Sequence, residues 1–339
     1  MTYSNNTQRN PWLDYLKAFA IYLVIAGHVL SNCMTQHGGG GKIDGIIYFV
    51  HIPLFLVISG LLVKEKTLDK QFGKGLLLRF VVPYTVWTVV LTTFYQGAGH
   101  LLHDGLKANA ETYLSNWGHS FLWFIKAYLV TYILWQVLQK LSCWWRLIVG
   151  TVLLFGLNLL VLPNKALSEI ASLSLYTYTL FGVGACVKKH MKKINRYTIV
   201  ALFACFLLCS PYATLSNSYF ECSFSHMLQY GDWHVFLIRM TAGACVSIAL
   251  ISCGRWLCRR KSPVQLRVVQ GIGQRTLQIY MLQSLLVEGA LSRVIRLNDD
   301  AWGTVSAFVI ALAMTWLCYV IIRYTQKLKL CRILLWGNK

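Results

Sequence analysis

The sequence contains few charged residues, and few of these are acidic. Asp, Glu, Lys and Arg together make up 13% of the 339 residues, and only 12 residues are Asp or Glu, whereas 56% of the chain is hydrophobic. The mean hydropathy is +0.51. Because soluble domains usually carry about 25% charged residues, this composition excludes an ordinary soluble protein and indicates one that lies in a membrane.

Three further features are missing. The 11 cysteines include no CxxC pair, the chain shows no metal-ligand spacing, and no small-residue cleavage pattern follows the first hydrophobic stretch. We therefore expect the cysteines to act as small packing residues, no metal to be bound, and the first stretch to stay in the mature protein. Two alternatives stay open: a disulfide between Cys33 and Cys222, and a zinc site at His100, His103 and Asp104.

Ten hydrophobic stretches are long enough to cross the roughly 30 Å core of a bilayer as helices. They are residues 12–32, 44–63, 80–100, 119–138, 144–163, 171–187, 197–213, 233–253, 272–292 and 302–322. The pattern predicts an all-α, polytopic membrane protein of about ten helices. We expect a single membrane-embedded domain over residues 1–339, with no attached soluble domain.

The basic residues are distributed unevenly between the loops. Of the 32, 24 fall on the side of the N-terminus, five on the other side and three within the stretches, whereas eight of the 12 acidic residues lie opposite the N-terminus. The positive-inside rule then places both termini in the cytoplasm. This asymmetry is typical of a multi-pass protein of the inner cell membrane, with membrane lipids as partners, and does not favour a nucleic-acid partner.

The first stretch, 12–32, carries three ionisable residues, Asp14, Lys17 and His28. Asp14 is one helical turn before Lys17 and can pair with it. Lys17 and His28 are eleven positions apart, so they share one helix face and lie about 16 Å apart along the axis. Ionisable groups inside a membrane are costly and usually mark a functional site, although an interfacial anchor and a packing histidine would explain the same residues.

The second stretch, 44–63, contains His51, Pro53 and the pair Ser59-Gly60. Pro53 frees a backbone carbonyl and bends the helix, which suggests a polar cavity beside His51. If the first two helices are antiparallel neighbours, His28 and His51 lie at similar depths. Ser59 is a candidate for contacting a ligand, but together with Gly60 it would also suit close helix packing.

Two other spans each contain a basic residue that lies about seven residues deep, counted from the membrane surface opposite the N-terminus. Lys126 in the fourth span could meet an acidic sugar or extend outward to the interface. Arg239 in the eighth span should face a cavity or pair with an acid such as Glu288.

The loop between the second and third spans is strongly basic. Its basic residues are Lys64, Lys66, Lys70, Lys74 and Arg79. Anionic lipid would be enough to explain such a cluster. A cytoplasmic ligand that carries phosphates would bind to the same residues.

Several of these motifs resemble the acyltransferase-3 family of integral membrane proteins, which O-acylate carbohydrates. The stretch LDYLKAFAIYLVIAGH is similar to the first-helix motif of the family, with Lys17 where Arg is usual, as in the branch that resembles fucose-4-O-acetylases. FVHIPLFLVISG resembles the second-helix pattern, Leu122-Trp123-Phe124 the LWF segment, and Arg79 before Pro83-Tyr84 the basic segment. GIGQRTLQIYMLQSLL resembles a late motif, but Gln283 stands where the family usually has His.

The resemblance implies transfer of an acyl group, most simply acetyl, from cytoplasmic acetyl-CoA to a sugar hydroxyl. The acceptor would be a surface or exported glycan, or its lipid-linked precursor, as in exopolysaccharide biosynthesis. Taken with the residue patterns, it gives catalytic roles to His28, Lys17 and Asp14, substrate-binding roles to His51, Ser59, Trp123, Lys126 and Arg239, and donor-binding roles to Arg79 and Lys74.

In this scheme the neutral imidazole of His28 takes the proton of the attacking hydroxyl, and His51 orients it or binds the acceptor. The donor enters from the cytoplasm and His28 lies in the outer half, so either the pantetheine arm threads a channel or the acyl group is relayed through an intermediate. The alternatives from other classes are a transporter or flippase of a polar glycoconjugate and a non-catalytic membrane scaffold.

Overall fold

The computed structural model describes residues 11–35, 41–102, 113, 122–161, 165–212, 223–224, 228, 233–260 and 266–337. These ranges are helical throughout, apart from short connections and an isolated bridge between Met34 and Leu297. The all-α class predicted from the sequence is confirmed.

The helices are α1 (Pro11–Cys33), α2 (Gly41–Leu62), α3 (Lys70–Leu76), α4 (Val82–Leu102), α6 (Trp123–Val137), α7 (Cys143–Val161), α8 (Lys165–Val187), α9 (Arg196–Cys209), α11 (Trp233–Arg260), α12 (Arg267–Gly273), α13 (Thr276–Gln283), α14 (Ser292–Val294), α15 (Ala301–Thr325) and α16 (Lys329–Leu334). Two π-helical segments, η1 (Leu77–Val81) and η5 (Ser284–Leu291), join α3 to α4 and α13 to α14. Short 3₁₀ turns follow α6 at Leu138–Lys140 and α9 at Ser210–Tyr212.

In the described part of the chain, seven helices are long and apolar enough to cross a membrane. They begin at residues 11, 43, 70, 143, 167, 233 and 301. The remaining three predicted spans coincide with α6, with α9 and with the broken segment α12–α13–η5–α14. α6 has 15 residues and is therefore about 22 Å long, which is shorter than the hydrocarbon core. The protein is a polytopic membrane protein, and the number of ten crossings stays a prediction.

The outer surface of the bundle is apolar, as contact with lipid requires. Large side chains of α7, α9 and α15 are exposed, among them Trp145 at 60%, Leu208 at 77% and Trp302 at 79%. Soluble monomers rarely expose such continuous apolar surface, because it would lie against water.

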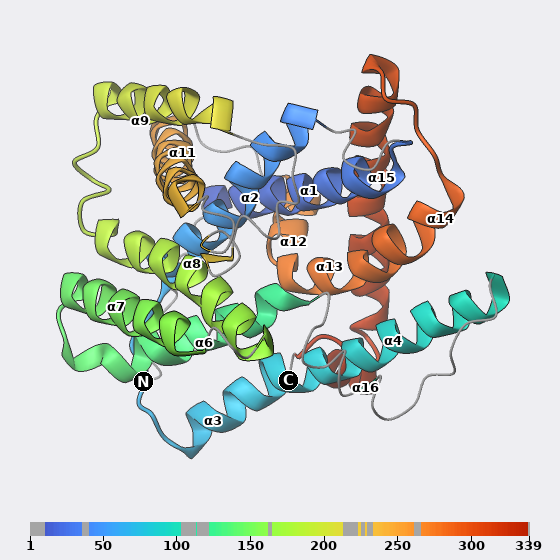
Figure 1. The fold of residues 1–339 in the computed structure, drawn as a ribbon, viewed down its shortest axis with the longest axis horizontal. Coiled ribbons are helices and arrows are strands. Elements are labelled where there is room, and N and C mark those ends of the chain that lie inside the picture. Colours follow the sequence, from blue (N-terminus) through green and yellow to red (C-terminus); the bar gives the residue numbers. More distant parts are fainter. Residues whose placement is uncertain are drawn as a thin grey trace, which may run out of the picture.

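α1 and α2 form the centre of the molecule (Figure 1), with α6, α7 and α8 on one side and α13, α14 and α15 on the other. α1 packs against α2, α11, α12 and α15. Ala20, Ile25, Ala26, Val29 and Leu30 of α1 are completely buried. Helices that are apolar over most of their surface are stable in such a central position, so the two helices that carry the predicted histidines lie inside the bundle.

Glycines bring the helices next to α2 and α1 unusually close. A Cβ atom on Gly60 of α2 would lie 1.9 Å from the carbonyl oxygen of Phe181 on α8, and one on Gly184 would lie 2.2 Å from that of Val57. On Gly273 of α12 it would lie 1.8 Å from the carbonyl oxygen of Asp14. Gly60 therefore serves close helix packing, as small residues commonly do between membrane helices.

The described part of the basic C-terminal tail is folded onto α4. Trp87 Nε1 of α4 donates a hydrogen bond of 2.9 Å to the carbonyl oxygen of Leu335. Trp336 is buried against Trp87, with 5.6 Å between the ring centroids. The tail thereby fixes the end of α4 next to η1.

The glycine contacts generate a stability prediction. Gly184→Ala should lower the stability of the detergent-purified protein by about 1–3 kcal/mol, because the added methyl group forces α8 away from α2. Gly156→Ala on α7 is the matched control, since nothing lies within 4 Å of its added Cβ and alanine favours the helix. Thermal unfolding checks both. Equal melting temperatures for Gly184→Ala and the native protein would show that the two helices are not in close contact.

Candidate active site

Polar residues from three distant segments gather around His28 of α1. Its Nδ1 atom lies 3.5 Å from Glu288 Oε1 on η5. His28 keeps 23% and Glu288 16% of its side chain accessible. Glu288 faces Nδ1, so the other ring nitrogen, Nε2, points away from this carboxylate, and part of the His28 side chain stays accessible.

Glu288 is held in place by its own segment. Gln283 Nε2 donates a 2.9 Å hydrogen bond to Glu288 Oε1, and Ser284 Oγ donates one of 3.2 Å to the same oxygen. The backbone is π-helical from Ser284 to Leu291. The wider turn brings residues five positions apart to the same side, such as Gln283 directly before this segment and Glu288 within it. Interruptions of this kind are frequent at functional sites. Gln283, which stands where the resembling family usually has histidine, therefore orients the partner of His28.

His51 lies on the neighbouring helix α2, but Tyr48 separates it from His28. The Tyr48 ring centroid is 6.4 Å from that of His28 and 4.7 Å from that of His51. His51 is 3% exposed, and its Nδ1 lies 2.8 Å from the carbonyl oxygen of Ile47. Since a carbonyl only accepts, Nδ1 carries the proton of a neutral ring. The two histidines therefore lie near each other on neighbouring helices, and His51 is too buried to serve as an open base.

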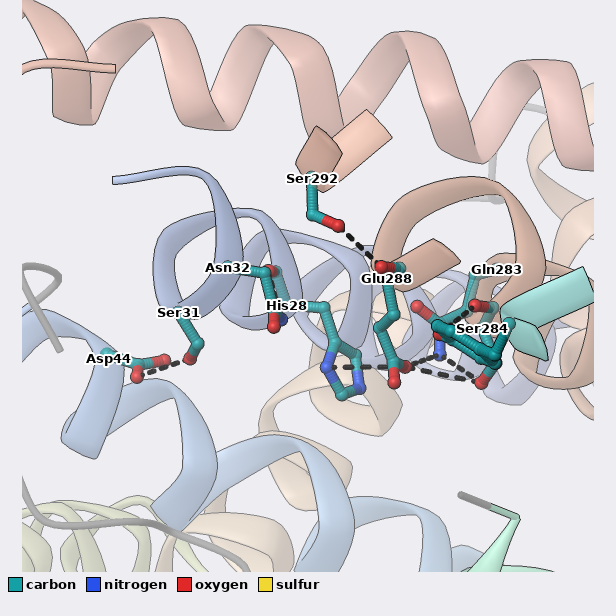
Figure 2. Close-up of polar contacts among 9 residues, drawn as sticks. His28, Ser31, Asn32, Asp44, Gln283, Ser284, Glu288 and Ser292 are labelled. Atoms are coloured by element: carbon teal, nitrogen blue, oxygen red, sulfur yellow. Dashed lines mark hydrogen bonds and ion pairs between the residues drawn. The ribbon is translucent and has the colours of Figure 1, made fainter. Parts of the chain in front are cut away.

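Asp44 lies on the opposite side of His28 from Glu288 (Figure 2). Ser31 Oγ donates a 2.8 Å hydrogen bond to Asp44 Oδ2, and Figure 2 shows His28 between this contact and the group around Glu288. Asp44 is close enough to interact electrostatically with both His28 and Arg239.

Arg239 is fully buried, with its guanidinium 5.3 Å from the Phe49 ring centroid. Its electrostatic partners include Tyr176, Tyr48 and Asp44. Glu288, suggested from the sequence as a partner of Arg239, contacts His28 instead. The sequence indicated no role for Asp44, at the start of the second stretch, or for Tyr48, because neither belongs to one of the motifs described above.

The other end of α1 holds the predicted ion pair. Lys17 Nζ lies 2.8 Å from Asp14 Oδ1, and Asp14 is 2% exposed. Gln274 Nε2, just after α12, lies 3.3 Å from the second oxygen of Asp14. The close approach of Gly273 allows this contact, so α12 is fixed against α1.

A family model described as an acyltransferase domain, acyltransferase-3, matches residues 10–324. The chain belongs to the acyltransferase-3 family. It is a membrane O-acyltransferase. Among the residues that the structure describes, those around His28 have an arrangement suited to proton transfer.

Two relatives are nodulation proteins NolL. The chain is 24% identical to NolL of Sinorhizobium fredii over 331 residues, which covers 90% of this chain and 85% of that protein. It is 25% identical to NolL of Mesorhizobium japonicum over 332 residues, which covers 91% and 84%. No solved structure matches the chain.

The predicted substrate residues of the acyltransferase are spread along α6 and its neighbours. Trp123 is at the start of α6, half-buried, with its ring 6.0 Å from that of Phe124. Ser59 is hydrogen-bonded to Tyr128, and Lys126 interacts electrostatically with Glu169 of α8. The structure does not bring these residues into contact with His28.

The predicted donor residues lie on α3 and η1. Lys74 and Arg79 are exposed, and the Arg79 guanidinium lies 5.8 Å from the Phe80 ring centroid. Nothing in the described residues groups three metal-binding side chains. His100, His103, Asp104 and Cys222, which carried the zinc and disulfide alternatives, have side chains outside the described residues.

A row of aromatic rings connects this basic segment with the site. The contacts run from Phe72 to Tyr132 (6.1 Å between centroids), Tyr132 to Tyr128 (6.3 Å), Tyr128 to Phe124 (6.0 Å) and Phe124 to Tyr280 (5.7 Å). Tyr280 interacts electrostatically with Glu288. We call these five rings the aromatic row.

The buried pair on α1 generates a second prediction. Lys17→Ala should lower stability by up to about 3 kcal/mol and reduce acyl transfer, because the Asp14 carboxylate loses its cation in a buried position. Lys17→Arg keeps the charge and should be milder on both counts. Thermal unfolding and turnover of the purified variants check this. Equal losses in both would show that the shape of the ammonium matters more than its charge.

Proposed function

We propose that this acyltransferase transfers an acetyl group from cytoplasmic acetyl-CoA to a sugar hydroxyl of a surface or exported glycan, within the inner cell membrane. The observation that carries the proposal is the contact between His28 and Glu288, which is the arrangement of a base and the carboxylate that orients it. The bias of basic residues toward the side of the termini supports a cytoplasmic donor.

The proposed chemistry uses His28 as a general base. The acceptor hydroxyl gives its proton to Nε2 while its oxygen attacks the thioester carbonyl. The Glu288 carboxylate, 3.5 Å from Nδ1, stabilises the imidazolium that forms. The tetrahedral intermediate then collapses to the ester, and the departing thiolate of CoA takes the proton back from Nε2.

The acceptor class is supported by two buried acceptor atoms near His28. Asp44 Oδ1 and Gln283 Oε1 receive no hydrogen bond from the described residues, although buried polar atoms are normally paired. They lie on opposite sides of His28 (Figure 2). A polyhydroxyl compound such as a sugar supplies several O–H donors and would pair both. Trp123 would offer a ring face to the sugar, while the buried Arg239 and His51 would fix the walls of the site.

The donor is proposed to bind along the aromatic row. Its phosphates would meet Lys74 and Arg79, since both cations are exposed at the start of the row. The pantetheine arm would follow the rings toward Tyr280, which ends the row beside Glu288. On this path the acyl group would be transferred directly to the acceptor rather than relayed through an intermediate.

The test is release of free CoA thiol by purified protein given acetyl-CoA and a glycan acceptor. His28→Gln should lower turnover by at least about 10²-fold, because glutamine cannot accept the proton. Glu288→Gln keeps the volume but removes the charge, and should lower turnover more than it raises KM. His190→Gln is the control, since this histidine is exposed on the turn after α8.

Near-normal turnover of a folded His28→Gln protein would contradict the assignment of the base. If the native protein released no thiol from acetyl-CoA in the presence of a glycan acceptor, the proposed donor and acceptor would be wrong.

The donor assignment has its own test. Arg79→Ala should raise the apparent KM for acetyl-CoA, and added salt should do the same by screening the phosphate contacts. Arg196→Ala removes an exposed arginine from the start of α9 and should leave that KM unchanged. A change confined to acceptor kinetics would place the donor elsewhere.

A further inference from the structure

A cleft lined by three arginines lies between α12 and α15, apart from both His28 and the aromatic row. Its volume is about 410 Å³, and its lining consists of Arg267, Val268, Gln270, Gly271, Gln274, Arg275, Tyr319 and Arg323. No acidic side chain lines it. Three guanidinium groups that line one cleft repel one another, and a bound anion would reduce that repulsion.

One of the arginines is held in a fixed orientation. Arg275 donates 3.1 Å hydrogen bonds from Nη1 to the carbonyl oxygen of Gly271 and from Nε to Gln326 Oε1. Its guanidinium also lies 5.7 Å from the Tyr319 ring centroid. A planar guanidinium that is positioned in advance suits a phosphate group, which it can bind through two parallel N–H groups.

The surroundings of the cleft identify the source of the phosphate. Four exposed apolar residues precede Arg323 on α15 by seven to eighteen positions. Their spacing of three to four residues places them on the same face of the helix as Arg323. They are Val305 at 53%, Val309 at 62%, Leu312 at 63% and Trp316 at 57% exposure. This stripe would face the acyl chains of the bilayer, and it ends at the arginines where a lipid headgroup would lie.

We propose that the arginine cleft binds the phosphate headgroup of an anionic phospholipid, with the acyl chains along the exposed stripe of α15. By the proposed orientation the lipid belongs to the cytoplasmic leaflet. Gln274, which lines the cleft, also contacts Asp14, so the lipid would lie next to the segment that fixes α12 against α1. The proposal rests on the membrane location of the protein and not on the acyl-transfer reaction.

The experiment measures retained phosphatidylglycerol and phosphatidylcholine by native mass spectrometry of the purified full chain in detergent. The test variant is Arg267→Gln with Arg323→Gln, because both side chains are exposed and their loss should not disturb folding. The matched control is Lys192→Gln with Lys193→Gln, an equal charge change on the exposed turn after α8. The double replacement of Arg267 and Arg323 by Lys keeps the charge.

We expect the native protein to retain phosphatidylglycerol in preference to phosphatidylcholine, and the double glutamine variant to bind it about tenfold more weakly. The lysine control should stay within about twofold of the native protein, and the charge-keeping variant should bind better than the glutamine variant. Unchanged thermal unfolding confirms that the variants are folded.

Three results would overturn the proposal. Equal weakening in the lysine control would show general attraction to a basic surface, and unchanged binding in the glutamine variant would show that the cleft is not used. Displacement of phosphatidylglycerol by acetyl-CoA, with the same dependence on Arg267 and Arg323, would make the cleft the donor site.

Discussion

An ionisable side chain held at the depth of a bilayer must find its partner inside the protein, because hydrocarbon does not solvate it. α1 carries ionisable side chains near both of its ends, and the broken segment α12–α13–η5 supplies a partner to each end. Gln274 reaches Asp14 at one end, beside the Lys17 ammonium, and Glu288 reaches His28 at the other. This pairing fixes α12, α13 and η5 along α1, and the position of the site follows from it.

The irregular backbone of this segment is tolerated because it is enclosed by protein rather than lipid. Gly273 lets the chain approach the backbone of Asp14, and the π-helical turn then brings Gln283 against Glu288. A regular helix in this position would point the two side chains in different directions. The interruption therefore supplies the carboxylate that faces the imidazole, and the sequence offered no signal for it beyond an unusual glutamine.

The hydropathy and the spacing of neighbouring residues were sufficient to predict most of the helices. Most of the ten hydrophobic stretches are single helices where the structure describes them, although 272–292 is broken between α12 and α13, and the ends of α1 and α2 lie within a few residues of those expected. The pair Asp14 and Lys17 was also predictable, because one helical turn separates them. The partner of Arg239 was harder to predict, because burial of a cation requires a partner but does not identify it. Its electrostatic partners come from α2 and α8 and do not include Glu288.

The sequence by itself determined that this is an all-α membrane protein with charged groups on its first helix, because hydropathy and helical spacing are properties of neighbouring residues. It also carried the motifs of the acyltransferase-3 family. Only the tertiary structure decided that Glu288 faces His28, that Tyr48 separates the two histidines, and that α12 and α15 share an arginine cleft. Such contacts depend on how each helix is rotated and shifted against another, which no local periodicity specifies.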